Sequence, residues 1–287
     1  MSKYSLLLSQ GKFVHKDSLK FPYEERGLQF GDGVYEVIRI YDGKLYLLDE
    51  HIDRLYRSLD AIKIKLNVSK EKLKSLLKDL IIRNEMNVDG FIYLQVSRGS
   101  AVRNHIFPEN TEPNLYAYVK DHARNVEGLE KGVRTITVQD ERWDNCYIKS
   151  LNLLPNVLAK QTAAEQGCYE AILHRDGIVT ECSSSNIFLV KDGKIYTHPT
   201  TKRILNGCVR MSVERFAEEL TIPFIEEAFT VEDIQHADEM FLTSSLSEVL
   251  PVIQVDDTTI ANGKPGIISR KLQEAYEKDA NITLQIV

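Results

Sequence analysis

The sequence has little of several features that mark particular classes of protein. Its four cysteines lie at spacings that match no zinc or redox motif, so free reduced thiols and no metal site are expected. No cluster of lysine and arginine stands out, and the net charge of −6 argues against nucleic-acid binding. The apolar run Leu6–Leu8 is too short for a signal-peptide core or a membrane span. We therefore expect a cytoplasmic protein of ordinary globular composition, with 43% hydrophobic and 27% charged residues.

The length of 287 residues is enough for two compact units with hydrophobic cores. Two strongly periodic helices between strand patterns in residues 1–119 predict a small α/β domain. The polar run at 120–131 is the natural linker. Residues 132–287 predict a larger, strand-rich domain with helices packed outside it.

Local signals set several expected boundaries. Asp49 and Ser69 are good N-caps for two successive helices. The glycine-dense segment 26–33 is expected to be a loop. Three Asp-Gly pairs, at 42–43, 176–177 and 192–193, are expected to turn hairpins.

The segment from Trp143 to Phe188 carries the clearest chemical signals. A short apolar–polar alternation, Cys146–Lys149, is typical of a strand and ends in a lysine. Later in the segment, Glu181 ends a second strand and is closely followed by a run of three serines and an asparagine, 183–186. We expect the rest of the chain to position these groups around one ligand.

Lys149 is the first candidate for covalent chemistry. A lysine is most often a solvated surface residue. Here its neighbours are largely apolar, which predicts partial burial of the amine: Trp143, Ile148, Leu151, Leu153 and Leu154. Desolvation lowers the pKa of a lysine and makes the amine competent as a Schiff-base nucleophile and then as a proton shuttle.

Glu181 could serve the same ligand as Lys149. The strand, helix and hairpin between the two residues are enough to bring their side chains across one pocket. A carboxylate facing a pyridine nitrogen keeps that nitrogen protonated, and a pyridoxal cofactor needs this in order to accept electrons. The alternative for Glu181 taken alone is an exposed carboxylate at a strand end.

Three features could bind the phosphate of such a cofactor. They are the amides of residues 206–209 at a helix start, the hydroxyl pair Ser244 and Ser245, and Arg54. Each signal is weak alone, because glycine begins many helices, serine pairs are common in turns, and an arginine on a helix is usually solvated.

Arg103 and His105 lie one residue apart in a long polar loop, 98–113. Loops of this length without secondary structure are usually functional or disordered. Together with Tyr35, the two residues predict a cationic trap for a carboxylate. The alternative, which the residues leave open, is a mobile surface loop.

These motifs occur in four segments: QFGDGVYEV (29–37), EHIDRL (50–55), IKSLNLL (148–154) and SSSN (183–186). In this order they resemble the D-amino acid aminotransferases, and the resemblance covers nearly the whole chain. Arg103-Asn104-His105 resembles the Arg-x-His loop that separates this group from its branched-chain relatives. The group belongs to the fold-type IV pyridoxal-phosphate enzymes. This implies a small N-terminal α/β domain and a larger C-terminal pseudo-barrel domain with outer helices.

Carried over by position, the resemblance implies a role for each candidate residue. Lys149 would form the internal aldimine with pyridoxal 5′-phosphate, and Glu181 would pair with the pyridine nitrogen. Further cofactor contacts would come from Arg54, Leu205, Cys208, Val209, Ser244, Ser245 and Ser184. Tyr35, Arg103 and His105 would bind the substrate carboxylate, with Ser185 nearby. The loop 98–113 would reach into the site of a neighbouring subunit, which implies a homodimer.

The activity implied is transamination between a D-amino acid, of the D-alanine or D-glutamate type, and a 2-oxo acid. An L-branched-chain or (R)-amine transaminase with the same core is the alternative within the class. Outside it, Lys149 with Ser183–Ser185 could act in an amidase-like hydrolase, or the chain could bind a phosphate ligand without catalysis. Two residues depart from the family pattern: Cys182 stands where glycine is usual, and Leu246 where a hydroxyl residue is usual.

Overall fold

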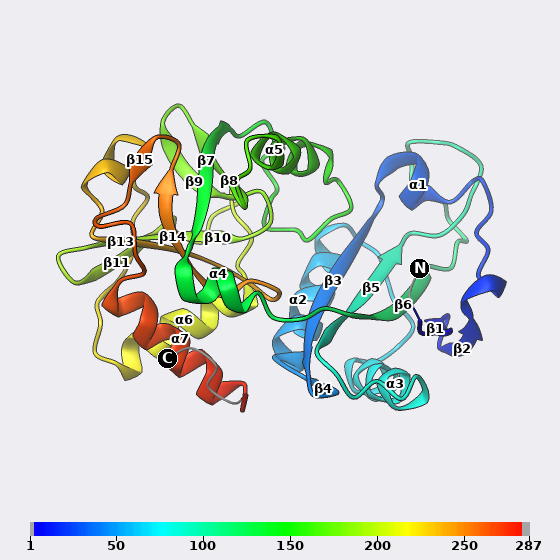
Figure 1. Cartoon of the computed structure of the whole chain (residues 1–287). Helices are drawn as coiled ribbons and strands as arrows, with labels where there is room; N and C mark the ends of the chain where they lie inside the picture. Colours follow the sequence, from blue (N-terminus) through cyan, green and yellow to red (C-terminus); the bar gives the residue numbers. More distant parts are fainter. Residues whose placement is uncertain (1–2, 283–287) are drawn as a thin grey trace. The chain divides into compact units, whose positions relative to one another are not determined.

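The computed structural model of the chain describes residues 3–282, and the chain forms two compact units. Unit 1 holds the residues up to Ala123 together with the short segment Ile148–Asn152. Unit 2 holds Arg124–Tyr147 and the chain from Leu153 onward (Figure 1). The predicted division at 1–119, 120–131 and 132–287 stays a prediction. Residues 120–131 contain the end of a strand and a short helix rather than an extended linker.

Unit 1 is built on a six-stranded sheet with the strand order β2-β1-β6-β5-β3-β4. Its strands are β1 (Leu6–Ser9), β2 (Lys12–His15), β3 (Gly33–Tyr41), β4 (Lys44–Leu45), β5 (Gly90–Ser97) and β6 (Asn114–Asp121). All neighbouring strands in this order run antiparallel. The sheet of unit 1 is therefore made by hairpins and returning strands rather than by parallel crossovers.

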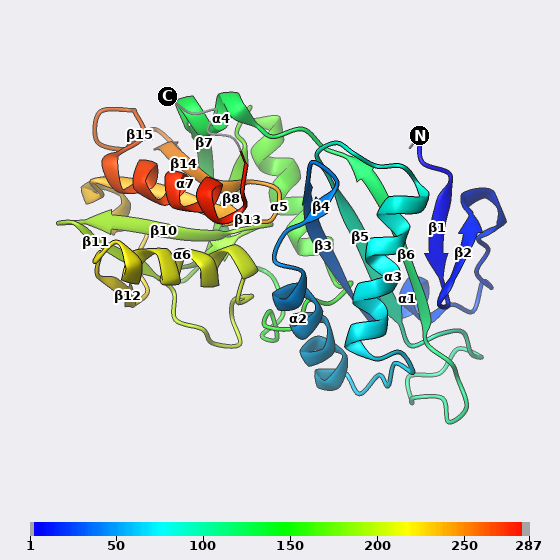
Figure 2. The same cartoon turned by 90° about the horizontal axis from the view of Figure 1, so that it is seen from below.

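Two helices cover one face of this sheet. Helix α2 (Leu48–Ala61) packs on β3, and helix α3 (Lys70–Arg83) packs on β1 and β6. Figure 2 shows both helices on the same side of the strands. Ile38 and Leu94 of the sheet and Leu55 and Leu77 of the helices are buried in the core between the layers. The short helices η1 (Lys16–Ser18) and α1 (Arg26–Phe30) complete unit 1.

Unit 2 contains a nine-stranded mixed sheet in the order β12-β11-β10-β13-β14-β7-β8-β9, with β15 paired to β14. Its strands are β7 (Val133–Gln139), β8 (Glu170–Arg175), β9 (Ile178–Cys182), β10 (Asn186–Lys191), β11 (Lys194–Thr197), β12 (Phe224–Glu226), β13 (Glu239–Ser244), β14 (Glu248–Val255) and β15 (Thr258–Thr259). Strands β9 and β10 contact each other although they are not neighbours in this order, because the sheet curls into a half-barrel.

The helices of unit 2 pack against its curled sheet. Helix α5 (Leu154–Glu165) packs on β7 and β8, and α4 (Val126–Lys131) packs on β14. Helix α6 (Cys208–Glu219) packs on β13 and lies beside α7 (Ile267–Asp279), as Figure 2 shows. The 3-10 helix η2 (Glu232–His236) precedes β13. The predicted two-part mixed fold with a strand-rich second part is confirmed.

Several expected boundaries are correct and others are wrong. Ser69 caps α3, because its side chain accepts a hydrogen bond from the amide of Lys72 at 3.2 Å. Asp49 does not cap α2, which begins at Leu48 after Leu47 in a left-handed conformation. The glycine-dense segment 26–33 is not simply a loop, because the Glu25 side chain accepts from the amide of Leu28 and begins α1.

None of the helices in residues 3–282 combines the length and apolar character needed to cross a membrane. The four cysteines, which all lie in this range, are free thiols.

Candidate active site

Lys149 lies in a segment that leaves one unit for the other. Ile148–Asn152 packs in unit 1, whereas the residues on both sides of it belong to unit 2. The carbonyl of Lys149 accepts a hydrogen bond from the amide of Tyr35 at 3.0 Å, and its own amide donates to Ser58 Oγ at 3.2 Å. The segment is a turn followed by a bridge to β3, so the predicted strand ending at Lys149 is wrong.

The side chain of Lys149 lies against Tyr35. Its Nζ donates to Tyr35 Oη at 3.3 Å and lies 4.3 Å from the centre of the tyrosine ring. The side chain of Lys149 is half-buried, in agreement with the partial burial predicted from its apolar neighbours. The structure thus brings together two predicted site residues, with the amine held at a ring face and a hydroxyl.

Arg54 lies in a buried ionic cluster on the inner side of α2. Its guanidinium donates two hydrogen bonds of 2.8 Å to the carboxylate of Glu36 on β3. His51 Nδ1 lies 2.7 Å from the same carboxylate. Burial opposes ionisation of Glu36, but Arg54 and His51 outweigh it and hold the pKa of this carboxyl well below its usual range. This arrangement fixes the orientation of the Arg54 side chain.

Glu36 was not among the predicted site residues, although the sequence contains a signal for it. The buried side of β3 is otherwise apolar, with Val34, Ile38 and Ile40 on it. A carboxylate on the apolar side of a strand requires a charged partner, because an unpaired buried charge is very costly. Arg54 and His51, one helical turn apart on α2, supply that partner.

Glu181 lies on β9 and is buried among hydrogen-bond donors of unit 2. Its carboxylate accepts from the guanidinium of Arg142, from Asn186 Nδ2 at 3.0 Å and from the amide of Leu205 at 3.1 Å. Burial raises the pKa of Glu181, while Arg142 and the Leu205 amide oppose that rise. The structure brings together the predicted residues Glu181 and Leu205. It also adds Arg142 and Asn186, which prediction from sequence missed.

Arg142 connects Glu181 to a second carboxylate. Its Nε and Nη2 each donate to Asp140 at 2.9 Å, while its Nη1 donates to Glu181. Arg175 and the Thr180 hydroxyl also donate to Asp140, at 3.3 and 2.9 Å. Asp140 therefore holds the guanidinium against Glu181, and the position of Glu181 is set by a network rather than by β9 alone.

The three serines after Cys182 converge on one buried carboxylate, Glu170 of β8. The hydroxyl of Ser184 donates to it at 2.6 Å and that of Ser185 at 3.3 Å, and Ser183 donates as well. Lys160 Nζ lies 3.4 Å from the same carboxylate. All three hydroxyls thus act as donors that hold the turn between β9 and β10, which does not favour a hydrolase with a serine nucleophile.

The departure from the family pattern at Cys182 lies in the core. Its side chain packs with Ile172, Val179 and Ile187 in unit 2, and burial raises the pKa of the thiol. The residue therefore replaces glycine as a small core side chain.

The remaining predicted phosphate-binding residues lie at two places in unit 2. Cys208 and Val209 form the first turn of α6, where the N-cap Gly207 offers no side-chain cap. Ser244 is the last residue of β13, and its hydroxyl donates to Ser247 Oγ at 3.0 Å. Ser247 supplies a hydroxyl one position after the unusual Leu246. Ser245 is partly exposed in the same turn.

Arg103 and His105 are exposed and both contact one aromatic ring, that of Phe30. The Arg103 guanidinium is 4.8 Å from the centre of the Phe30 ring, and the His105 ring is 5.4 Å from it in an edge-on arrangement. Among residues 3–282, neither forms a hydrogen bond or ring contact with Tyr35. The loop 98–113 is thus held against α1, and the three residues predicted as one trap do not meet within the chain.

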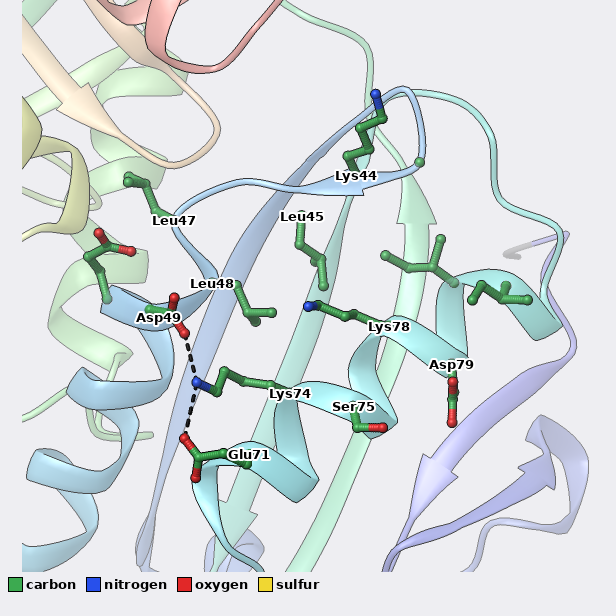
Figure 3. A pocket seen from close by; sticks show the side chains of 14 residues that line it. Lys44, Leu45, Leu47, Leu48, Asp49, Glu71, Lys74, Ser75, Lys78 and Asp79 are labelled. Carbon is green, nitrogen blue, oxygen red and sulfur yellow. Dashed lines mark hydrogen bonds and ion pairs between the residues drawn. The ribbon is translucent and has the colours of Figure 1, made fainter.

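A groove of about 1070 Å³ lies elsewhere in unit 1, between the start of α2 and α3 (Figure 3). Its walls include Leu45, Leu48 and Ile82, and Lys74 spans it to bond Asp49 at 2.8 Å. None of the predicted site residues lines it. The groove is therefore not a candidate for the chemistry above. Its ion pair is of the exposed kind, which contributes little stability.

Comparisons with known proteins identify relatives of the chain. Residues 33–255 match the family described as amino-transferase class IV. The chain is 48% identical to a D-alanine aminotransferase of Staphylococcus aureus (strain N315) over 269 residues, which cover 93% of this chain and 95% of that protein. It is 46% identical to a D-alanine aminotransferase of Bacillus licheniformis over 271 residues, covering 94% and 95%.

Solved structures agree on the fold. A branched-chain amino acid aminotransferase from T.th., described with pyridoxamine 5′-phosphate, superposes with a TM-score of 0.88 at 27% identity and covers 98% of this chain and 96% of that chain. The branched-chain enzyme of Escherichia coli superposes with a TM-score of 0.90 at 24% identity, covering 96% and 94%, which shows the fold alone. The match to the family over most of the chain, and the identity to its members, show that the chain belongs to the class IV aminotransferases.

Proposed function

We propose that this protein transfers the amino group of a D-amino acid to a 2-oxo acid, with pyridoxal 5′-phosphate as its cofactor. The observation that carries the proposal is the identity of 46–48% to D-alanine aminotransferases over more than nine-tenths of the chain. Substrates of the D-alanine or D-glutamate type follow from those relatives. The branched-chain alternative has lower identity, 27%, to the branched-chain enzyme from T.th..

The donor groups of the chain fit this cofactor. Lys149 offers an amine beside a tyrosine hydroxyl, which suits a carbonyl carbon. Glu181 offers a carboxylate that is fixed by Arg142, Asn186 and the Leu205 amide, which suits a protonated ring nitrogen. An arginine, a serine hydroxyl and the first turn of a helix suit a phosphate.

We assign the cofactor and substrate contacts to the residues predicted from the sequence. Lys149 would bind the cofactor covalently, and Glu181 would pair with its ring nitrogen. Arg54, Ser244 and the amides of Cys208 and Val209 would hold the phosphate, with Ser245 nearby. Leu205 would pack against the ring, Ser184 would lie beside the cofactor, and Ser185 would lie beside the substrate.

The chemistry divides between the cofactor and the chain. Pyridoxal phosphate, when bound, supplies an electron sink for the carbanion that forms at the substrate Cα. Lys149 Nζ would take the proton from the substrate Cα and, in the reverse half-reaction, would return a proton to the Cα of the product amino acid. The Tyr35 hydroxyl and ring hold this amine in place. The Glu181 carboxylate would accept a hydrogen bond from the protonated ring nitrogen and so hold the proton there.

The substrate carboxylate is bound by Tyr35, Arg103 and His105. Since Arg103 and His105 do not meet Tyr35 within one chain, we propose a homodimer in which the loop 98–113 serves the site of the neighbouring subunit. Sedimentation of the purified protein tests this, because a monomer that is fully active would contradict it. We further propose that the protein works in the cytoplasm.

The visible spectrum of the purified protein before and after addition of D-alanine tests the proposed function. We expect the band of bound pyridoxal phosphate to bleach with D-alanine, while parallel samples with L-alanine and L-leucine keep it. Bleaching with L-leucine alone would move the protein to the branched-chain group. No band after incubation with pyridoxal phosphate would overturn the proposal.

A second test is the change Lys149→Ala. We expect turnover of D-alanine to fall by about 10³-fold or more, because both the covalent attachment and the proton carrier are lost. Lys149→Arg is the matched control that keeps the positive charge, and it should be equally inactive. Normal turnover of Lys149→Ala without added amines would contradict the assignment.

A further inference from the structure

The side chain of Phe30 contacts two exposed residues of the loop 98–113, Arg103 and His105. The Arg103 guanidinium lies 4.8 Å from its ring centre, and the His105 ring lies 5.4 Å from it at an interplanar angle of 61°. Arg26 contacts the same ring at 4.6 Å. One half-buried aromatic ring therefore contacts both of the loop residues that we assign to the substrate carboxylate.

Hydrogen bonds hold the backbone of the loop at its start and at Asn104. Arg98 at the start of the loop forms two hydrogen bonds to Asp32, at 2.8 and 2.9 Å. Asp32 also accepts from Arg26 Nε at 2.8 Å, and Arg26 Nη1 donates to the carbonyl of Asn104 at 2.6 Å. This buried ionic cluster holds the loop backbone at Asn104, between Arg103 and His105.

A fixed backbone does not by itself fix the side chains of Arg103 and His105. Both are exposed, and an exposed arginine loses considerable rotamer entropy when it is held in one position. The face of an aromatic ring is negative and attracts a guanidinium. An imidazole ring can pack edge-on against the same ring. The Phe30 ring supplies that attraction to both side chains from one place.

We propose that Phe30 is a positioning residue that sets the specificity of the protein for substrates with an α-carboxylate. It holds Arg103 and His105 at a fixed separation, so that both side chains can meet one carboxylate without a further loss of side-chain freedom. The inference rests on the proposed role of this loop in binding the carboxylate. It does not depend on which subunit's substrate the loop serves.

The test uses steady-state kinetics of the holoenzyme with D-alanine. For Phe30→Leu, which removes the ring, we expect KM to rise about 3- to 10-fold with kcat unchanged, since weak cation–π contacts have this size. Phe30→Tyr keeps the ring, so its KM should equal that of the native protein. Phe91→Leu is the matched control: Phe91 is a half-buried ring of β5 that contacts His122, away from this loop, and it should leave KM unchanged.

Two further variants separate positioning from general damage. Pentafluorophenylalanine at position 30 keeps the shape of the ring but reverses the charge of its face, so it should raise KM as Phe30→Leu does. This variant decides the matter if Phe30→Leu does not fold. In a chain that already carries Arg103→Ala and His105→Ala, Phe30→Leu should raise KM no further, because the residues through which it acts are gone.

The possible failures are distinguishable. If Arg103→Ala leaves the KM for D-alanine unchanged, the proposed role of the loop is wrong whatever Phe30 does. If Arg103→Ala raises KM but neither Phe30→Leu nor the fluorinated ring does, the inference about Phe30 alone is overturned. The same conclusion follows if Phe30→Leu still raises KM in the chain without Arg103 and His105.

Discussion

Two buried carboxylates, one in each unit, have pKa values that are shifted in opposite directions. Glu36 in unit 1 receives two hydrogen bonds from Arg54 and lies against His51, and its pKa is lowered despite complete burial. Glu181 in unit 2 receives one guanidinium and two neutral donors, and its pKa is raised because burial outweighs Arg142. Arg142 is itself shared with Asp140.

The difference shows what each carboxylate can do. Glu36 has its charge compensated within unit 1, so its role is to hold Arg54 in one orientation. The charge of Glu181 is compensated less completely by the chain, because Arg142 is shared between Glu181 and Asp140. A positive group of a ligand, such as a protonated pyridine nitrogen, would lower the pKa of Glu181 in the way that Arg54 lowers that of Glu36.

The largest effect on stability is expected for Glu36→Gln. Removing the charge leaves Arg54 buried without its anionic partner, which typically costs about 3–5 kcal/mol. The free energy of unfolding, measured by urea denaturation, should fall by this amount. Asp53→Asn is the matched control on the same helix, because it breaks the exposed ion pair with Lys70 and should change little. Equal losses in the two variants would contradict the role given to Glu36.

Glu181→Gln is expected to reduce turnover of D-alanine by about 10²–10³-fold, the size seen when one preorganised electrostatic contact is removed. The amide keeps the shape of the side chain, so the cofactor band should persist while kcat falls. Absorbance and kcat measured on the same sample check this. A variant with normal kcat would show that the ring nitrogen does not need this carboxylate.

A third buried carboxylate, Glu170, sharpens the comparison because its partners are mainly hydroxyl groups. Glu170→Gln leaves Ser183 and Ser184 to share a weaker acceptor, so we expect a loss of about 1–3 kcal/mol in the free energy of unfolding. Thermal unfolding of this variant beside Glu36→Gln measures the difference. A larger loss of stability for Glu170→Gln than for Glu36→Gln would contradict the expected order.

The smallest effect is a pH dependence of stability that arises from Glu36. Its folded pKa lies below the unfolded value of 4.5, so its contribution is fully present above pH 4.5 and is lost as the pH falls below that value. A single group of this kind gives a slope of at most about 1.4 kcal/mol per pH unit. Denaturation at several acidic pH values should show a weaker decline in Glu36→Gln than in the native protein. If stability falls equally with pH in both proteins, Glu36 is not the source of the pH dependence.

Much of the local structure could be predicted from the sequence, because it depends on residues close together in the chain. The three Asp-Gly pairs turn hairpins as expected, and both residues of each pair have positive φ, between 45° and 82°. Ser69 begins α3, and residues 206–208 begin α6, as their capping and glycine signals predict. The Asp49 prediction failed because Leu47, rather than Asp49, occupies the turn before α2.

The sequence by itself determined which residues could carry the chemistry, since Lys149, Glu181 and the Arg103–His105 pair stand out by type and spacing. Only the tertiary structure decided what each one touches. The Tyr35 hydroxyl lies beside Lys149, the Arg142 guanidinium binds Glu181, and the Phe30 ring contacts Arg103 and His105. Each of these contacts joins residues 39 to 114 positions apart in the chain. Such contacts depend on the register of strands and the packing of loops, which no local pattern encodes.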